Sequence, residues 1–148
     1  MNDLEYMHLA IVQARAAALR GEVPIGAVVV LNDQILAAAG NRTITDCDPT
    51  AHAEIVALRE AAREAGNHRL LGAAVYVTVE PCAMCAGALV QARIARLVYG
   101  ADEPKGGAVR TCLRVLDAPA LNHRVEVVSG VLAAEAVQLL QSFFSSRR

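Results

Sequence analysis

Short apolar segments rich in valine and alanine alternate with longer segments of helical periodicity, and this alternation constrains the fold most strongly. Apolar residues recur at steps of three and four from Leu4 to Ala18, which predicts an amphipathic helix over 3–20. The same patterns predict further helices over 49–65, 82–93, 112–116 and 132–144, and strands over 23–31, 34–39, 73–79, 96–100 and 125–128. Strands that alternate with helices predict an α/β protein whose sheet lies between helical layers.

The pair Asn32-Asp33 joins the first two predicted strands and favours a tight antiparallel hairpin. Gly21 and Gly66 follow helical segments, where glycine commonly ends a helix. We therefore expect a three-layer α/β/α fold with a central mixed sheet of about five strands and an antiparallel hairpin at one edge. A length of 148 residues suits a single domain over 1–148.

Composition excludes some classes of protein and leaves others open. No apolar segment approaches the about 20 residues of a membrane-spanning helix, and the acidic N-terminus lacks a secretory signal, so we expect a cytoplasmic chain with no membrane partner. The net charge of −1 gives no general attraction to polyanions. Thirteen arginines against one lysine would suit contacts with RNA, but a GC-rich genome produces the same bias.

Cys82 and Cys85 carry the clearest chemical signal in the chain. Their spacing of three places both sulfurs on one face of a predicted helix, near its N-terminus, where the thiolate forms are favoured. His52 lies at the start of another predicted helix and adds a neutral nitrogen. Two thiolates and one imidazole suit Zn²⁺ and leave its fourth position open to water, which is the pattern of a catalytic metal site.

Glu54 is predicted to move protons at that site. An offset of two residues from His52 points its side chain away from the ligand direction on a regular helix, so a ligand role is unfavourable. A carboxylate beside a metal-activated water can take its proton and transfer it to a substrate. Hydrolytic loss of an amine requires both groups.

Other interpretations of these residues stay open from the sequence alone. The two cysteines could form a thioredoxin-like redox pair. A purely structural zinc site would need a fourth protein ligand, for which Cys47, His68, Cys112 and His123 are available. The site could also belong to a zinc-stabilised RNA-binding module or to a deaminase of free bases or nucleosides, such as a guanine or cytosine deaminase.

The order His52-Ala53-Glu54 followed by Pro81-Cys82-Ala83-Met84-Cys85 resembles the cytidine and nucleobase deaminase superfamily. Flanking segments narrow the resemblance to the bacterial tRNA-specific adenosine deaminases of that superfamily, and the likeness covers nearly the whole chain. These segments are Glu22 to Val28, Gly40-Asn41-Arg42, Asp48 to Ile55, Leu121 to Arg124 and Phe143-Phe144.

The resemblance implies hydrolytic conversion of the wobble adenosine in a tRNA anticodon to inosine, with release of ammonia. It also implies one zinc ion per subunit, a cytoplasmic homodimer and the anticodon stem-loop as the bound partner. By the family pattern, Glu54 protonates N1 of adenine and then the departing amine. Asn41 and the backbone of Ala53 would hold the edge of the base, and Ile25 would lie against its face.

The same resemblance assigns RNA contacts near the C-terminus and in one loop. Lys105 and Arg148 are expected to contact phosphates, and Phe144 to contact the anticodon loop. Family members usually carry Asp two residues before this lysine, whereas this chain has Glu103, which is expected to approach the RNA backbone. The stretch 109–112 also replaces the Gly-Ser that the family usually has before the next helix.

Overall fold

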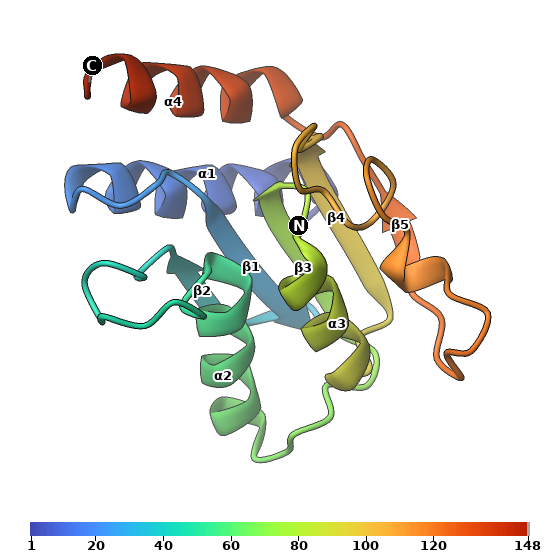
Figure 1. Cartoon of the computed structure of the whole chain (residues 1–148). Coiled ribbons are helices and arrows are strands. Elements are labelled where there is room, and N and C mark those ends of the chain that lie inside the picture. Colours follow the sequence, from blue (N-terminus) through green and yellow to red (C-terminus); the bar gives the residue numbers. More distant parts are fainter. Residues whose placement is uncertain (148) are drawn as a thin grey trace.

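The computed structural model describes residues 1–147 and has a central sheet between two layers of helices (Figure 1). Its elements are α1 (Asp3–Leu19), β1 (Gly26–Leu31), β2 (Gln34–Gly40), α2 (Ala53–Ala65), β3 (Ala74–Val79), α3 (Ala83–Gln91), β4 (Arg96–Ala101), the 3₁₀ turn η1 (Val115–Asp117), β5 (Glu126–Val128) and α4 (Ala133–Ser145). The expected three-layer α/β/α architecture is confirmed.

The sheet is mixed and has the strand order β2-β1-β3-β4-β5. β1 pairs antiparallel with both β2 and β3, whereas β3, β4 and β5 run parallel to one another. The predicted antiparallel hairpin therefore forms one edge. Because β3 and β4 are parallel, the segments that follow Val79 and Ala101 leave the sheet at the same end.

The two faces of the sheet are covered by different helices, because side chains alternate along a strand. Val28 and Val30 of β1 pack with Tyr6 and Met7 of α1. Residues of the opposite face belong to the larger core, which includes buried side chains of α2 and α3. α4 packs near α1 on the first face (Figure 1). Thus α2 and α3 lie together on one side of the sheet.

The hairpin turn has the backbone that its sequence requires. Asn32 and Asp33 have positive φ values of 51° and 60°, which is the left-handed pair of a two-residue type I′ turn. The register shifts between Val29 and Val30, so β2 carries a bulge close to the turn. The turn was predictable because few residues adopt this conformation readily.

Two predicted boundaries are wrong. The first strand begins at Gly26, since Ile25 N–H donates to Val23 O in a turn before it. The second helix begins at Ala53, because Asp48 instead accepts hydrogen bonds from Thr50 in a local turn. His52 is consequently the N-cap residue and does not lie within the helix.

The predicted helix over 112–116 is replaced by turns and by η1. The N–H groups of Val109, Arg110 and Thr111 donate to the side chain of Glu80, so a buried carboxylate organises the approach to this segment. No helix in the described part of the chain is long and apolar enough to cross a membrane.

Candidate active site

His52, Cys82 and Cys85 come together in the structure, and their potential ligand atoms all lie within 4.8 Å of one another. His52 Nδ1 is 3.6 Å from Cys82 Sγ and 3.5 Å from Cys85 Sγ. His52 is the N-cap of α2 and Cys82 is the N-cap of α3. The cluster therefore joins the N-termini of two neighbouring helices, whose partial positive charges favour thiolates.

These distances fit a tetrahedral metal ion. Zinc bonds of about 2.3 Å to sulfur and about 2.0–2.1 Å to nitrogen at a tetrahedral angle place the sulfur and the nitrogen about 3.6 Å apart. The two observed distances, 3.6 Å and 3.5 Å, match this value. Within residues 1–147 the group has only these three members, so the geometry favours a site with an open fourth position over a closed structural site.

The remaining cysteines have other surroundings. Cys47 and Cys112 are exposed, and their thiols donate to the carbonyl oxygens of Ile44 and Pro104. His123 is hydrogen-bonded through Nε2 to Ile94 O. The sequence alone allowed each of these residues to be the fourth ligand of a structural metal site. The tertiary structure does not bring them to the cluster of His52, Cys82 and Cys85.

Hydrogen bonding inside the cluster polarises its thiols. Contacts with Cys85 and then with His52 lower the pKa of Cys82 to about 3. The pKa of Cys85 is raised, chiefly by its hydrogen bond to Cys82 and by burial. The contact with Cys82 also raises the pKa of His52. One thiolate is thus already favoured in the protein, which prepares the site for a cation.

Glu54 lies in the first turn of α2 and is only 4% exposed. Burial raises its pKa to about 7, so the carboxyl group exchanges a proton readily near neutral pH. Cys85 and Glu54 each influence the pKa of the other, which places the carboxyl group beside the cluster. A buried carboxyl group with this pKa has the properties of a general acid and base.

Asn41 connects the end of β2 to the start of α2. Its Oδ1 accepts the N–H of Ala53 at 2.9 Å, and its own N–H donates to Ile25 O at 3.1 Å. The Asn41 side chain is itself buried. The structure therefore brings three predicted base contacts, Ile25, Asn41 and Ala53, into one network next to His52.

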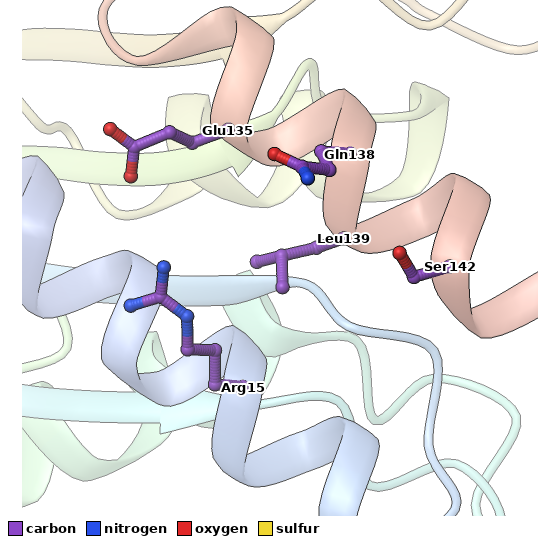
Figure 2. A pocket seen from close by; sticks show the side chains of 5 residues that line it. All are labelled: Arg15, Glu135, Gln138, Leu139 and Ser142. Carbon is purple, nitrogen blue, oxygen red and sulfur yellow. The ribbon is translucent and has the colours of Figure 1, made fainter.

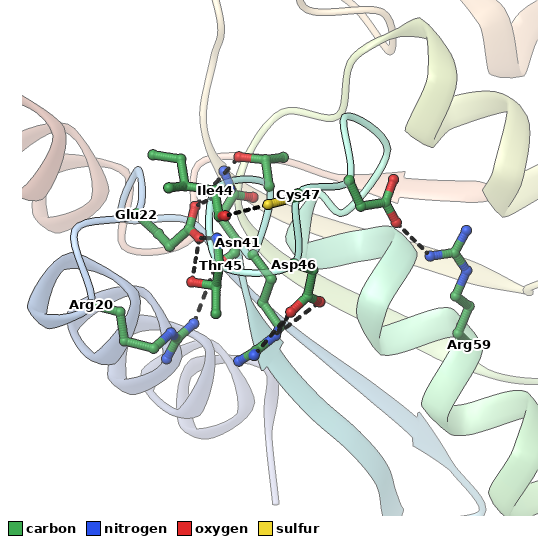
Figure 3. Close-up of polar contacts among 11 residues, drawn as sticks. Arg20, Glu22, Asn41, Ile44, Thr45, Asp46, Cys47 and Arg59 are labelled. Atoms are coloured by element: carbon green, nitrogen blue, oxygen red, sulfur yellow. Dashed lines mark hydrogen bonds and ion pairs between the residues drawn. The ribbon is translucent and has the colours of Figure 1, made fainter.

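A second buried carboxylate holds the loop between β2 and α2. Glu22 accepts hydrogen bonds from the backbone of Ile44 and from the backbone and hydroxyl of Thr45, the last two at 2.7 and 2.6 Å (Figure 3). Burial opposes ionisation, but these donors and the Thr43 hydroxyl outweigh it and lower the pKa of Glu22. The loop that carries Asn41 and His52 is consequently tied to the end of α1.

A cavity of about 850 Å³ gathers the predicted RNA contacts from two parts of the chain. Glu103 and Lys105 line it from the loop after β4, and Phe144 lines it from α4. Val79, three residues before Cys82, forms part of its wall. The cavity therefore lies at the end of the sheet from which α3, the helix capped by Cys82, starts. Phe144 is 49% exposed and is available for contact. Arg148 lies outside the described residues.

Another hollow of about 510 Å³ lies between α1 and α4, where the Arg15 and Glu135 side chains point into the space between the helices (Figure 2). Its other lining residues are Gln138, Leu139 and Ser142. None of the residues predicted for the site lines this hollow. The cavity beside Val79 is therefore the better candidate for substrate contact.

The sequence reasoning missed two residues that shape the site, Glu22 and Glu80. Burial raises the pKa of Glu80, but N–H donors of Arg110 and Glu103 and both donors of Thr111 outweigh it and lower the pKa to about 2. The sequence offers one signal for Glu80, which is an acidic residue directly after the apolar strand that ends at Val79. A charge buried at such a position needs several compensating donors.

Comparison with known proteins agrees with this geometry. A family model described as MafB19-like deaminase matches residues 1–148. The tRNA-specific adenosine deaminase of Agrobacterium fabrum is 50% identical over 143 residues, which are 97% of this chain and 94% of that protein. The chain belongs to the tRNA-specific adenosine deaminase family. The Bacillus subtilis member of this family is 48% identical over 146 residues, covering 99% of this chain and 91% of that one.

A solved structure from work on A-to-I editing by tRNA:A34 deaminases at the wobble position has the same fold as this deaminase. It superposes with a TM-score of 0.89 and 50% sequence identity, covering 92% of this chain and 99% of that one. The layered architecture is thus that of a deaminase, and its clustered His52, Cys82 and Cys85 could hold a metal ion.

Proposed function

We propose that this chain catalyses hydrolytic deamination of the wobble adenosine in a tRNA anticodon, using water and producing inosine and ammonia. The observation that carries the proposal is the cluster of His52, Cys82 and Cys85 beside the buried Glu54, in a chain 50% identical to a tRNA-specific adenosine deaminase over 97% of its length. The whole chain acts as one deaminase domain.

The metal is zinc, one ion per subunit, held by His52, Cys82 and Cys85. The mixed nitrogen and thiolate donors and their spacing support this identity. When bound, zinc supplies a Lewis acid that lowers the pKa of a coordinated water. Glu54 would accept a first proton from the attacking water and deliver it to N1 of adenine. It would then accept the second proton of that water and deliver it to the departing amine, which leaves as ammonia. A pKa of about 7 suits Glu54 to both directions of transfer.

Recognition divides between the base and the surrounding loop of RNA. Asn41 and Ala53 bind the edge of the adenine, and Ile25 packs against its face. Glu103, Lys105 and Phe144 contact the anticodon loop from the cavity beside β3, where a cation and an exposed aromatic ring suit phosphate and base contacts. Arg148 adds a phosphate contact. An anticodon loop has unpaired bases, so removing the target base from its stack costs little.

The enzyme acts in the cytoplasm, where its tRNA substrate is found. It acts as a homodimer, since the family resemblance implies two subunits. An apolar groove of about 430 Å³ between α2 and α3 supports this assembly. Ile55 and Leu58 line it from α2 and Ala88 from α3, so a second copy could cover apolar surface close to the metal helices.

The direct test is to incubate the zinc-loaded protein with an anticodon stem-loop of an arginine tRNA and to sequence the product for inosine. Conversion at the wobble position is expected, and its absence with a zinc-loaded preparation would reject the proposal. Guanine, cytosine and their nucleosides are offered in parallel, with ammonia release as the signal. Ammonia from these small substrates alone would identify a free-base or nucleoside deaminase instead.

A further inference from the structure

Glu80 occupies an unusual position at the end of β3. It is only 3% exposed, and both of its carboxylate oxygens accept hydrogen bonds from one loop. Oε1 accepts the Glu103 N–H at 3.1 Å and the Thr111 hydroxyl. Oε2 accepts the N–H groups of Val109, Arg110 and Thr111 at 3.1, 2.9 and 3.0 Å. A single side chain thus binds both ends of the segment 103–111.

This segment carries two of the proposed RNA contacts and has no helix or strand of its own. Glu103 and Lys105 line the cavity at its start. Its internal bonds are local: Lys105 N–H donates to the Glu103 carboxylate and Gly107 N–H donates to Glu103 O, both at 2.9 Å. Without regular backbone pairing, the position of the loop depends on a few attachments, of which Glu80 makes the most hydrogen bonds; the Arg110 side chain adds bonds to Val127 O and Ser129 Oγ.

The attachment point is close to the metal cluster. Glu80 precedes Pro81 and Cys82, the N-cap of α3, and Ala108 N–H donates to Pro81 O at 2.9 Å. Gly107 packs so tightly on the Glu80 carboxylate that an added Cβ would overlap its Oε1 atom. The loop and the start of the metal helix are therefore held together by short, buried contacts.

We propose that Glu80 is a positioning residue that sets the RNA-contacting loop 103–111 at a defined place relative to the metal cluster. The proposal rests on the proposed function, because it assigns Glu103 and Lys105 to RNA. A buried carboxylate suits this role, since charge-assisted hydrogen bonds are short and strong and their loss leaves donors unpaired. Glu80 does not touch substrate; it acts through Glu103 and Lys105.

The substitution Glu80→Gln tests the proposal with little change of shape. The amide keeps one oxygen, which can accept the three N–H groups that donate to Oε2 in the original protein. Its NH₂ group then faces the Glu103 N–H, so that two donors oppose each other. The Thr111 hydroxyl can rotate and accept a hydrogen bond from that NH₂ group. The Glu103 N–H can only donate, so it loses its acceptor. The substitution therefore loosens Glu103 in particular. Thr111→Val removes one hydroxyl bond, and Thr111→Ser restores it.

In Glu80→Gln, KM for the anticodon stem-loop should rise about tenfold, the effect of losing one charge-assisted hydrogen bond. The value of kcat and the zinc content should stay within about threefold, a limit of about 0.7 kcal/mol. Thr111→Val should raise KM less, and Thr111→Ser should recover the original value. Asp3→Asn is the matched control: it removes a carboxylate that Arg96 and Tyr76 bind at the opposite end of the sheet, so it should lower stability and leave KM unchanged.

Amide hydrogen exchange gives a second reading that needs no substrate. The Glu103 amide should exchange faster in Glu80→Gln than in the original protein, while amides of α2 keep their protection. Unchanged KM with unchanged exchange at Glu103 would overturn the proposal, and so would loss of zinc or of kcat at constant KM. Failure of the original protein to form inosine would reject the proposed function, whereas the exchange result would still report on the loop.

Discussion

His52 Nδ1 lies 3.6 Å from Cys82 Sγ although the two residues are 30 positions apart in the chain. The contact forms because α2 and α3 lie side by side on one face of the sheet and present their N-termini together (Figure 1). Their meeting converts two short sequence motifs into one metal-binding geometry.

Substitution of a ligand tests that geometry. Cys82→Ala should abolish stoichiometric zinc binding and deamination, because two protein ligands hold the ion much less firmly than three. The melting temperature should also fall, since assembly of the site is coupled to folding. Elemental analysis and thermal unfolding measure these effects. Cys47→Ala is the control, because Cys47 is exposed and lies outside the cluster, and it should retain the metal. A Cys82→Ala protein with full zinc content would contradict the assignment.

Glu54→Gln separates proton transfer from metal binding. The amide nearly preserves the shape of the side chain but cannot exchange a proton, so kcat should fall by about 10² to 10⁴. Zinc content and binding of the stem-loop should change little, as the amide leaves the three ligands in place. Single-turnover inosine formation, elemental analysis and a binding titration are measured on the same preparation. Retained kcat would exclude Glu54 as the proton carrier.

Phe144→Ala should weaken RNA binding. The ring is 49% exposed and lines the cavity with Glu103 and Lys105, so its removal costs substrate contact more than packing. Loss of one stacked base contact should raise KM about tenfold, with little change in melting temperature. Phe144→Tyr keeps an aromatic ring and should restore binding. Equal KM values for the alanine and tyrosine variants would show that no base stacks there.

Asp3→Asn should reduce stability in a pH-dependent way. Arg96 donates to both oxygens of Asp3 at 2.6 Å, and this contact, with help from Tyr76, lowers the Asp3 pKa against the opposing effect of burial. A lowered pKa in the folded state adds stability above the unfolded value of about 3.9 and loses it as the pH falls below. The variant should be about 1–2 kcal/mol less stable at pH 7, allowing for partial solvent exposure of the pair.

Urea unfolding at a series of pH values checks this prediction. The difference between the original protein and Asp3→Asn should be constant above about pH 5 and shrink progressively below about pH 4. A difference that grows on acidification would have the wrong sign for a salt-bridged carboxylate. Deamination at saturating RNA should be unaffected at pH 7, since Arg96 begins β4 whereas the cavity lies at its other end.

Much of the fold followed from local signals. The Asn32-Asp33 hairpin was predictable because its turn needs two residues that tolerate positive φ. Helix ends were less predictable: Asp48-Pro49 looks like a helix start, but Asp48 bonds locally to Thr50 and the helix begins only at Ala53. The predicted helix after Cys112 failed because a distant side chain, Glu80, binds the preceding backbone.

The sequence by itself indicated the type of chemistry, because two cysteines at a spacing of three together with a histidine favour a metal site, and a nearby carboxylate can carry protons. The tertiary structure decided which residues meet. It brought His52 to Cys82 and Cys85, left Cys47 and Cys112 outside, and buried Glu54 so that its pKa rises to about 7. It also tied the loop of Glu103 to Glu80. Such contacts depend on burial and on chain crossings over long separations, which spacing along the sequence does not encode.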